Sequence, residues 1–278
     1  MRLCAVIPFL AFMLKWLLAP ACVFATDTLL IASGCSVSNI GYLSDLAREY
    51  ERVNPHVTLL VRGGGSPLGI DELKMDKTDF TTSCMSKRPD DPDYLEFVPV
   101  AWDALVFITH KSNPTDNIKL EDVRRIYEGD VMNWQRIGGP GMPLKLFMSR
   151  PPGMSGVREA LDRYVMKGRE IVLQPDSITF DASVATWEQI IEITPEGFGS
   201  TGFASARRRN VKMLKVDGVA PTKENIISGK YPFKRKLYLV VNRLDYPPKT
   251  REFIEFAVSG EGQKFIGNLG IPSLAEMK

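Results

Sequence analysis

The stretch that decides the fold is Ser149-Arg150-Pro151-Pro152-Gly153-Met154-Ser155-Gly156-Val157-Arg158. It follows an apolar, strand-like run at 144–148 and leads into a helical pattern at 159–166. A strand that turns through Gly and Ser into a helix leaves free backbone N–H groups at the positive end of the helix dipole, where anions bind. Arg150 and Arg158 add positive charge beside this turn. The alternative interpretation is an ordinary loop whose serine caps the helix.

Strand–turn–helix units of the same kind fill the beginning of the chain. Apolar runs at 29–32 and 57–61 predict buried strands, and 79–84 predicts a third strand edge. Each run ends in a turn rich in Gly, Ser or Cys, and helical patterns follow at 42–53 and 70–75. Parallel βαβ units are right-handed and collect ligands at the carboxyl ends of their strands. We therefore expect these turns and the 149–158 loop to face one binding site.

The remaining pattern predicts an α/β protein of two lobes. Two long apolar strands, 97–108 and 236–242, suit crossings from one lobe to the other. Shorter strands are expected at 178–180 and 197–203, and helices at 119–127, 184–193, 250–258 and 263–269. We assign residues 26–101 and 240–278 to lobe 1 and residues 102–239 to lobe 2.

Residues 1–25 have the pattern of a signal peptide. Arg2 precedes two apolar runs split by Lys15, and Val23-Phe24-Ala25 ends before polar residues, as at a signal-peptidase site. An uncleaved anchor is one alternative, although Lys15 inside a membrane span is costly. Lipid attachment at Cys22 is another, because residues 18–22 loosely resemble a lipobox. The pattern as a whole predicts export to the periplasm.

Charge and cysteine content narrow the class of partner. The 278-residue chain is 44% hydrophobic and 24% charged, as in a globular protein. Without residues 1–25 it has 33 basic and 33 acidic residues, a balance that gives no indication of nucleic-acid binding. Cys35 and Cys84 are then the only cysteines, and in an oxidising compartment they form either a disulfide or two buried thiols. If the first strand lies beside the third in the sheet, Cys35 and Cys84 are neighbours.

The order of elements resembles a known family, the phosphate-binding components of ABC importers within the type II periplasmic binding proteins. The resemblance covers nearly all of the chain after residue 25 and is most specific at 221–232, 236–240 and 253–264. It implies two lobes, each with a doubly wound mixed sheet, joined by two crossing strands. It also implies a monomer that is not an enzyme, needs no cofactor or metal, and captures a small oxyanion for an ABC permease in the membrane. Phosphate is the first expectation for that oxyanion.

The resemblance also places the ligand-binding residues, which come from four loops. They are Ser36, Val37 and Ser38 after the first strand, Gly65 and Ser66 in the second loop, Cys84 after the third strand, and Arg150, Ser155, Gly156 and Val157 from lobe 2. Two departures leave the identity of the oxyanion open. Cys84 stands where the family has an Asp that accepts the proton of hydrogen phosphate, and Asp79 is expected to hold a loop instead. The family's Thr hydroxyl is replaced by Val157 if Met154 is an insertion, or by Gly156 if it is not.

Two other functions remain open on the sequence alone. The same scaffold with a different anionic solute, or with a sensing role, is the first alternative, favoured by Cys84 and Val157. A hydrolase is more distant, since neither His56 nor His110 lies near a candidate nucleophile in the order of elements. Neither histidine has a partner at metal-ligand spacing.

Overall fold

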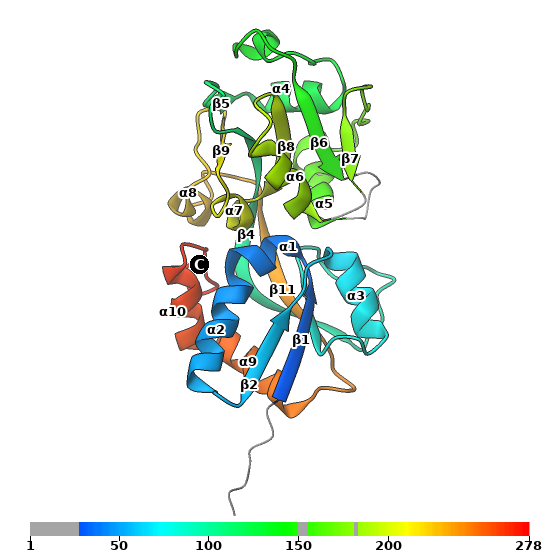
Figure 1. Ribbon diagram of the computed structural model, residues 1–278, viewed down its shortest axis with the longest axis vertical. Coiled ribbons are helices and arrows are strands. Elements are labelled where there is room, and N and C mark those ends of the chain that lie inside the picture. Colours follow the sequence, from blue (N-terminus) through cyan, green and yellow to red (C-terminus); the bar gives the residue numbers. More distant parts are fainter. Residues whose placement is uncertain (1–27, 150–154, 181–182, 278) are drawn as a thin grey trace, which may run out of the picture.

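The computed structural model describes residues 28–149, 155–180 and 183–277, and two lobes lie one above the other along its long axis (Figure 1). Strands β4 (Leu95–His110) and β11 (Lys234–Asn242) run between the lobes. The two strands pair antiparallel along most of their length. The predicted leader, Cys22 and Arg150 lie outside the described residues.

In lobe 1 the strand order is β2-β1-β3-β11-β4. Strand β1 pairs in parallel with β2 and with β3, which confirms the predicted neighbourhood of the first and third strands. The strands are β1 (Thr28–Gly34), β2 (Val57–Val61) and β3 (Phe80–Ser83). The helices are α1 (Ser36–Ser38), α2 (Ser44–Val53), α3 (Ser66–Lys74), α9 (Pro248–Val258) and α10 (Gly260–Asn268), with a π-helical turn at Asn39–Leu43.

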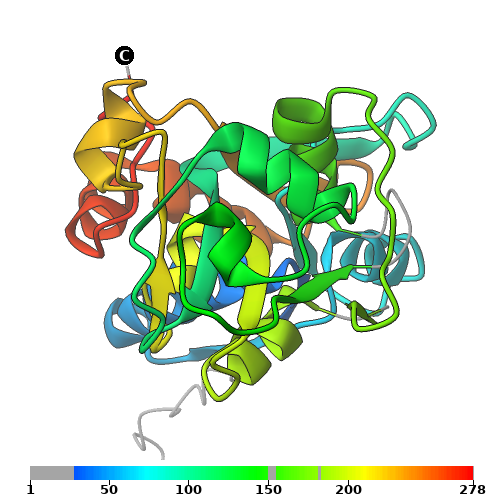
Figure 2. The same cartoon turned by 90° about the horizontal axis from the view of Figure 1, so that it is seen from above.

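In lobe 2 the strand order is β4-β8-β6-β7, with β9 added to β4. The strands are β6 (Lys145–Ser149), β7 (Ile178–Phe180), β8 (Gly197–Gly202) and β9 (Val211–Met213), with a separate pair of β5 (Asn117–Ile118) and β10 (Lys215–Val216). The helices are α4 (Leu120–Tyr127), α5 (Gly156–Leu161), α6 (Val184–Ile191), α7 (Phe203–Ala206) and α8 (Lys223–Ile227). Seen from above, helices lie on either side of the strands of this lobe (Figure 2).

The burial of each strand explains its pattern of apolar and polar residues. Residues 103–109 of β4 are all buried, and apart from Asp103 and Thr109 they form a continuous apolar run, as expected for a strand covered on both faces. Edge strand β2 alternates buried and exposed residues instead. Trp134 packs edge-on against Phe198 in the core of lobe 2. These elements form where the sequence predicts strands and core.

The structure corrects the predicted starts of several helices and adds short elements. Helix α10 begins at Gly260 rather than at 263, and α9 begins at Pro248 rather than at 250. Helix α3 begins at Ser66 rather than at 70, because Gly65 takes a positive φ of 97° and Pro67 favours the first turn. The helix predicted at 159–166 begins at Gly156 and ends in a π-helical turn at Asp162–Met166. Elements of two to five residues, such as β5 and α8, are too short to show a period in sequence. The lobe boundaries after residues 101 and 239 fall inside β4 and β11 and stay a prediction.

Candidate functional site

A pocket lies where the two lobes meet, at the carboxyl ends of β1 and β3. Lobe 1 contributes residues from the turn after β1, from the start of α3 and from the end of β3, and lobe 2 contributes the starts of α5 and α6. The lining residues are Cys35, Ser36, Val37, Gly65, Ser66, Cys84, Ser155, Gly156, Val157, Ser183 and Val184. In Figure 1, α1, α3, α5 and α6 all approach the boundary between the lobes.

Helix starts give this pocket its electrostatic character. Ser155 and Ser183 cap α5 and α6, because their Oγ atoms accept hydrogen bonds from the backbone N–H groups of Arg158 (3.1 Å) and Ala185 (3.2 Å). Ser66 is the first residue of α3, whose first turn also lies at the pocket. Backbone N–H groups at helix starts carry partial positive charge. The pocket therefore presents N–H and hydroxyl donors to a ligand, and its described lining has no carboxylate.

The lobes touch each other across the pocket. The hydroxyl groups of Ser36 and Ser183 form a hydrogen bond from lobe 1 to lobe 2. Gly156 packs so closely on Cys84 that a Cβ atom there would lie 2.6 Å from the carbonyl oxygen of Cys84. A side chain at 156 would hold the lobes apart, so this glycine permits the closed arrangement.

Two free thiols lie side by side at the lobe 1 wall of the pocket. Their sulfur atoms are 2.7 Å apart, and both residues are buried. The predicted neighbourhood of Cys35 and Cys84 is thus confirmed, and of the two alternatives the structure has two buried thiols. Ser66 is adjacent, since its Oγ accepts a hydrogen bond from the backbone N–H of Cys84 (3.2 Å) and lies 3.6 Å from the Cys84 sulfur.

A buried ion pair that the sequence analysis missed lies beside the thiols. The Nε and Nη2 atoms of Arg235 donate to Oδ2 of Asp103 at 3.0 and 2.9 Å. The other carboxylate oxygen of Asp103 accepts from the backbone N–H of Ala204, which ties α7 to β4. Nη1 of Arg235 is buried and has no hydrogen-bond partner in the part of the chain that the structure describes. The sequence could have indicated this residue. Arg235 lies two residues from Phe233 and from Leu237, which are both core residues, so it faces the same side of the strand as they do.

Most of the predicted ligand residues come together in this pocket. They are Ser36, Val37, Gly65, Ser66, Cys84, Ser155, Gly156 and Val157. Ser38 is fully buried behind the lining, and Arg150 lies outside the described residues. Ser183 and Val184 also line the pocket, whereas the sequence indicates only the start of a helix at 184. The sequence could have indicated these two residues as site residues, because they follow a short strand, as the other pocket residues do. Ligand contact by each of these residues stays a prediction.

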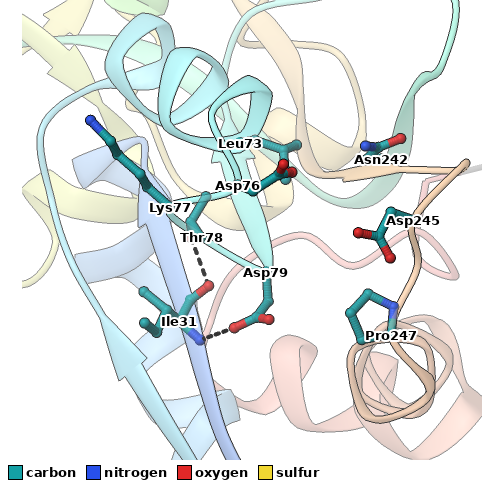
Figure 3. A pocket seen from close by; sticks show the side chains of 9 residues that line it. All are labelled: Ile31, Leu73, Asp76, Lys77, Thr78, Asp79, Asn242, Asp245 and Pro247. Carbon is teal, nitrogen blue, oxygen red and sulfur yellow. Dashed lines mark hydrogen bonds between the residues drawn. The ribbon is translucent and has the colours of Figure 1, made fainter.

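Asp79 has the loop-holding position expected for it, away from the thiols. Its Oδ2 atom accepts a hydrogen bond from the backbone N–H of Ile31 (2.6 Å), and Thr78 donates to the carbonyl of the same residue (Figure 3). The second pocket drawn there is lined by Asp76, Asp79 and Asp245 and by one lysine. Three carboxylates repel anions, so this pocket does not suit a phosphate-like ligand.

Other kinds of site are not assembled in the described chain. Over 28–149, 155–180 and 183–277, no group of three or more His, Cys, Asp or Glu side chains is arranged to hold a metal ion. The ring of His110 pairs with the hydroxyl of Ser112 on the surface, away from the pocket. Within the same ranges, no helix has the length and apolar content needed to span a bilayer.

Comparison with known proteins gives concordant results. A family model described as a PBP superfamily domain matches residues 23–261. The phosphate-binding protein PstS of Borreliella burgdorferi is 28% identical over 274 residues, which cover 94% of this chain and 97% of that protein. PstS of Bacillus subtilis is 25% identical over 223 residues, covering 79% and 72% of the two chains. A crystal structure described as a putative phosphate ABC transporter substrate-binding protein with bound phosphate, from Clostridium perfringens, superimposes with a TM-score of 0.79 at 23% identity, covering 89% of this chain and 100% of that one.

Proposed function

Because the chain belongs to the PBP superfamily, we propose that it is an extracytoplasmic solute-binding protein that captures a small oxyanion, phosphate first, for an ABC importer. Its fold is the type II periplasmic-binding-protein fold that the sequence predicted, with two lobes joined by β4 and β11. One observation carries the proposed function. Helix starts and serine hydroxyls from both lobes converge on a single pocket whose described lining has no carboxylate.

The donors of this pocket suit an oxyanion. Backbone N–H groups at the starts of α3, α5 and α6 and the hydroxyls of Ser36, Ser66, Ser155 and Ser183 would replace the water shell of the ion. Arg150, which precedes the loop into α5, would supply a full positive charge. Movement of the lobes about β4 and β11 would then admit and enclose the ion.

Chemistry on the ligand is not part of the proposal. Hydrolysis by a serine nucleophile requires a base such as histidine within hydrogen-bond reach. The pocket has serines and two cysteines, but none of its described lining residues is a histidine, aspartate or glutamate. Binding and release without turnover are what this donor set supports.

The names of the relatives support phosphate as the ligand and an ABC transporter as the partner that receives it. Borreliella burgdorferi and Bacillus subtilis proteins are named phosphate-binding, and the superimposed Clostridium perfringens structure is described as an ABC transporter component with phosphate bound. We infer from this an exported monomer that delivers its ligand to a membrane permease. Residues 1–25 would be the leader for that export.

Isothermal titration of ligand-stripped protein tests the function. One-site binding of phosphate is expected, with arsenate, sulfate and molybdate titrated in parallel to establish selectivity. Ser66→Ala should weaken binding about 10- to 100-fold, because a hydrogen bond to a charged ligand contributes about 1.5–3 kcal/mol. Ser228→Ala is the matched control, since Ser228 is exposed on α8's end and lies outside the pocket. Absence of heat with all four anions would refute the proposal.

A further inference from the structure

We propose that Cys35 and Cys84 form a thiol–disulfide exchange site in the cleft, and that the anion binds more tightly when the two cysteines are joined than when they are free. The exchange site is inferred from the positions of the two thiols and of Arg235, and it does not depend on the proposed function. The effect on affinity rests on the proposed function, because it requires an anion in the pocket.

The backbone places the two cysteines side by side. They follow neighbouring parallel strands, with Gly34 beside Thr82 in the register, and the backbone N–H of Cys35 donates to the carbonyl of Thr82 at 3.0 Å. The sulfur atoms are 2.7 Å apart. A disulfide bond is about 2.05 Å long, so the two sulfur atoms must approach each other by about 0.7 Å to form it.

The surroundings favour a thiolate on Cys35. Burial raises its pKa, but the hydrogen bond shared with Cys84, the positive charge of Arg235 and hydrogen bonds with Ser38 together lower the pKa to about 6. The hydrogen bond to Cys35 raises the pKa of Cys84, which therefore keeps its proton. Tyr42 also faces the pair, and burial raises its pKa, so it stays neutral. The guanidinium of Arg235 is positioned for this role because Asp103 holds two of its nitrogens and the third has no described partner.

Such a pair reacts with a disulfide in two balanced steps. The Cys35 thiolate attacks one sulfur of an external disulfide, a small molecule or another protein, and expels the other sulfur as a thiolate. The sulfur of Cys84 then attacks Cys35 in the mixed disulfide, its proton passes to one of the released thiolates, and the Cys35–Cys84 bond forms. The external disulfide is reduced by two electrons to one thiol and one thiolate, and the cysteine pair is oxidised by the same two electrons.

Lobe opening increases access to the pair. Cys35 is 2% exposed and Cys84 is 7% exposed. Gly156 of lobe 2 packs on the carbonyl of Cys84, and the hydrogen bond between Ser36 and Ser183 closes the pocket beside them. Separation of the lobes therefore widens the approach to the thiols, although Cys84 also lines a second, open pocket beside Arg235. A bound anion that keeps the lobes together protects the thiols.

Joining the cysteines changes the charge that the anion meets. Both cysteines line the same pocket as Ser36, Ser66 and Ser155, so a thiolate on Cys35 repels an anion held by those hydroxyls. A disulfide is neutral and removes that repulsion. It also leaves the positive charge of Arg235 without the thiolate beside it. We expect the disulfide form to bind phosphate at least about tenfold more tightly.

The test compares the two redox forms of one preparation of the exported chain. Reduced protein is incubated with oxidised glutathione, with and without saturating phosphate, and alkylatable thiols and intact mass are followed with time. Without phosphate, both thiols should disappear with the loss of two hydrogen atoms, and phosphate should slow this reaction at least tenfold. Cys35→Ser should react much more slowly than Cys84→Ser, and Cys84→Ser should stop at a glutathione adduct.

Phosphate titration of each form then separates the two parts of the proposal. Tighter binding by the disulfide form supports it, whereas equal affinity, or tighter binding by the reduced form, overturns the effect on affinity. Two thiols that stay alkylatable after oxidation without phosphate overturn the exchange site. If neither form binds phosphate but the disulfide still forms, the proposed function fails and the exchange site stands.

Discussion

Gly156→Ala offers a sharp test of how the lobes close. Gly156 begins α5 in lobe 2 and faces the end of β3 in lobe 1. A Cβ atom added there would meet the carbonyl oxygen of Cys84 at 2.6 Å, with its carbonyl carbon and its sulfur at 2.7 Å. Real Cβ atoms keep at least 3.0 Å, so the methyl group and the loop would have to move apart by at least 0.4 Å.

This clash destabilises the closed arrangement of the lobes and not the open one. Forcing an extra methyl into a well-packed contact typically costs about 1–3 kcal/mol, which corresponds to a loss of anion affinity of about 5- to 150-fold. Opening of the lobes relieves the clash, so the free energy of unfolding should not fall. Alanine also has a helix propensity better than that of glycine by up to about 1 kcal/mol. The variant should therefore fold normally and bind weakly.

Isothermal titration with phosphate and thermal melting without ligand measure the two quantities separately. Gly260→Ala is the matched control, because it also begins a helix and a Cβ atom there would have nothing within 4 Å. It should leave both affinity and melting temperature unchanged. If Gly156→Ala binds phosphate within about twofold of the parent chain, the lobes do not close against Cys84 as the structure indicates. A melting temperature lowered together with affinity would mean a folding defect instead.

The remaining predictions concern stability. Asp79→Ala should lower the free energy of unfolding by about 1–3 kcal/mol in urea titrations, because the backbone N–H of Ile31 loses its acceptor in a part-buried hydrogen bond, and phosphate affinity should not change in the folded fraction. Asp103→Ala should lower the free energy of unfolding by about 3–5 kcal/mol, because Arg235 becomes an unpaired buried charge. A decrease in that free energy of less than about 1 kcal/mol would contradict the buried pair. Burial raises the pKa of Glu188, so the folded chain keeps this proton over a pH interval in which the unfolded chain has lost it. Stability should therefore fall as pH rises through that interval, and Glu188→Gln should flatten the slope measured by melting across pH.

The local units of this protein could be predicted from its sequence. The run 57–61 forms β2 at the predicted residues, and 178–180 forms β7. Alternation, apolar runs and small-residue turns are properties of neighbouring residues, so the sequence displays them directly. The turns that the sequence indicates after the strands at 29–32 and 57–61, and the loop at 149–158, each contribute described residues to the pocket.

The pairings across the pocket were decided by the tertiary structure. Ser36 meets Ser183 across 147 residues, and Arg235 meets Asp103 across 132. Nothing local to either segment encodes such a partner, because the meeting depends on how β4 and β11 bring the lobes together. The presence of two thiols in the pocket could be predicted from strand order, but their 2.7 Å separation and the charge of Arg235 beside them could not. Periodicity fixes which side of a strand a residue faces, whereas only the packing of distant segments fixes what it faces.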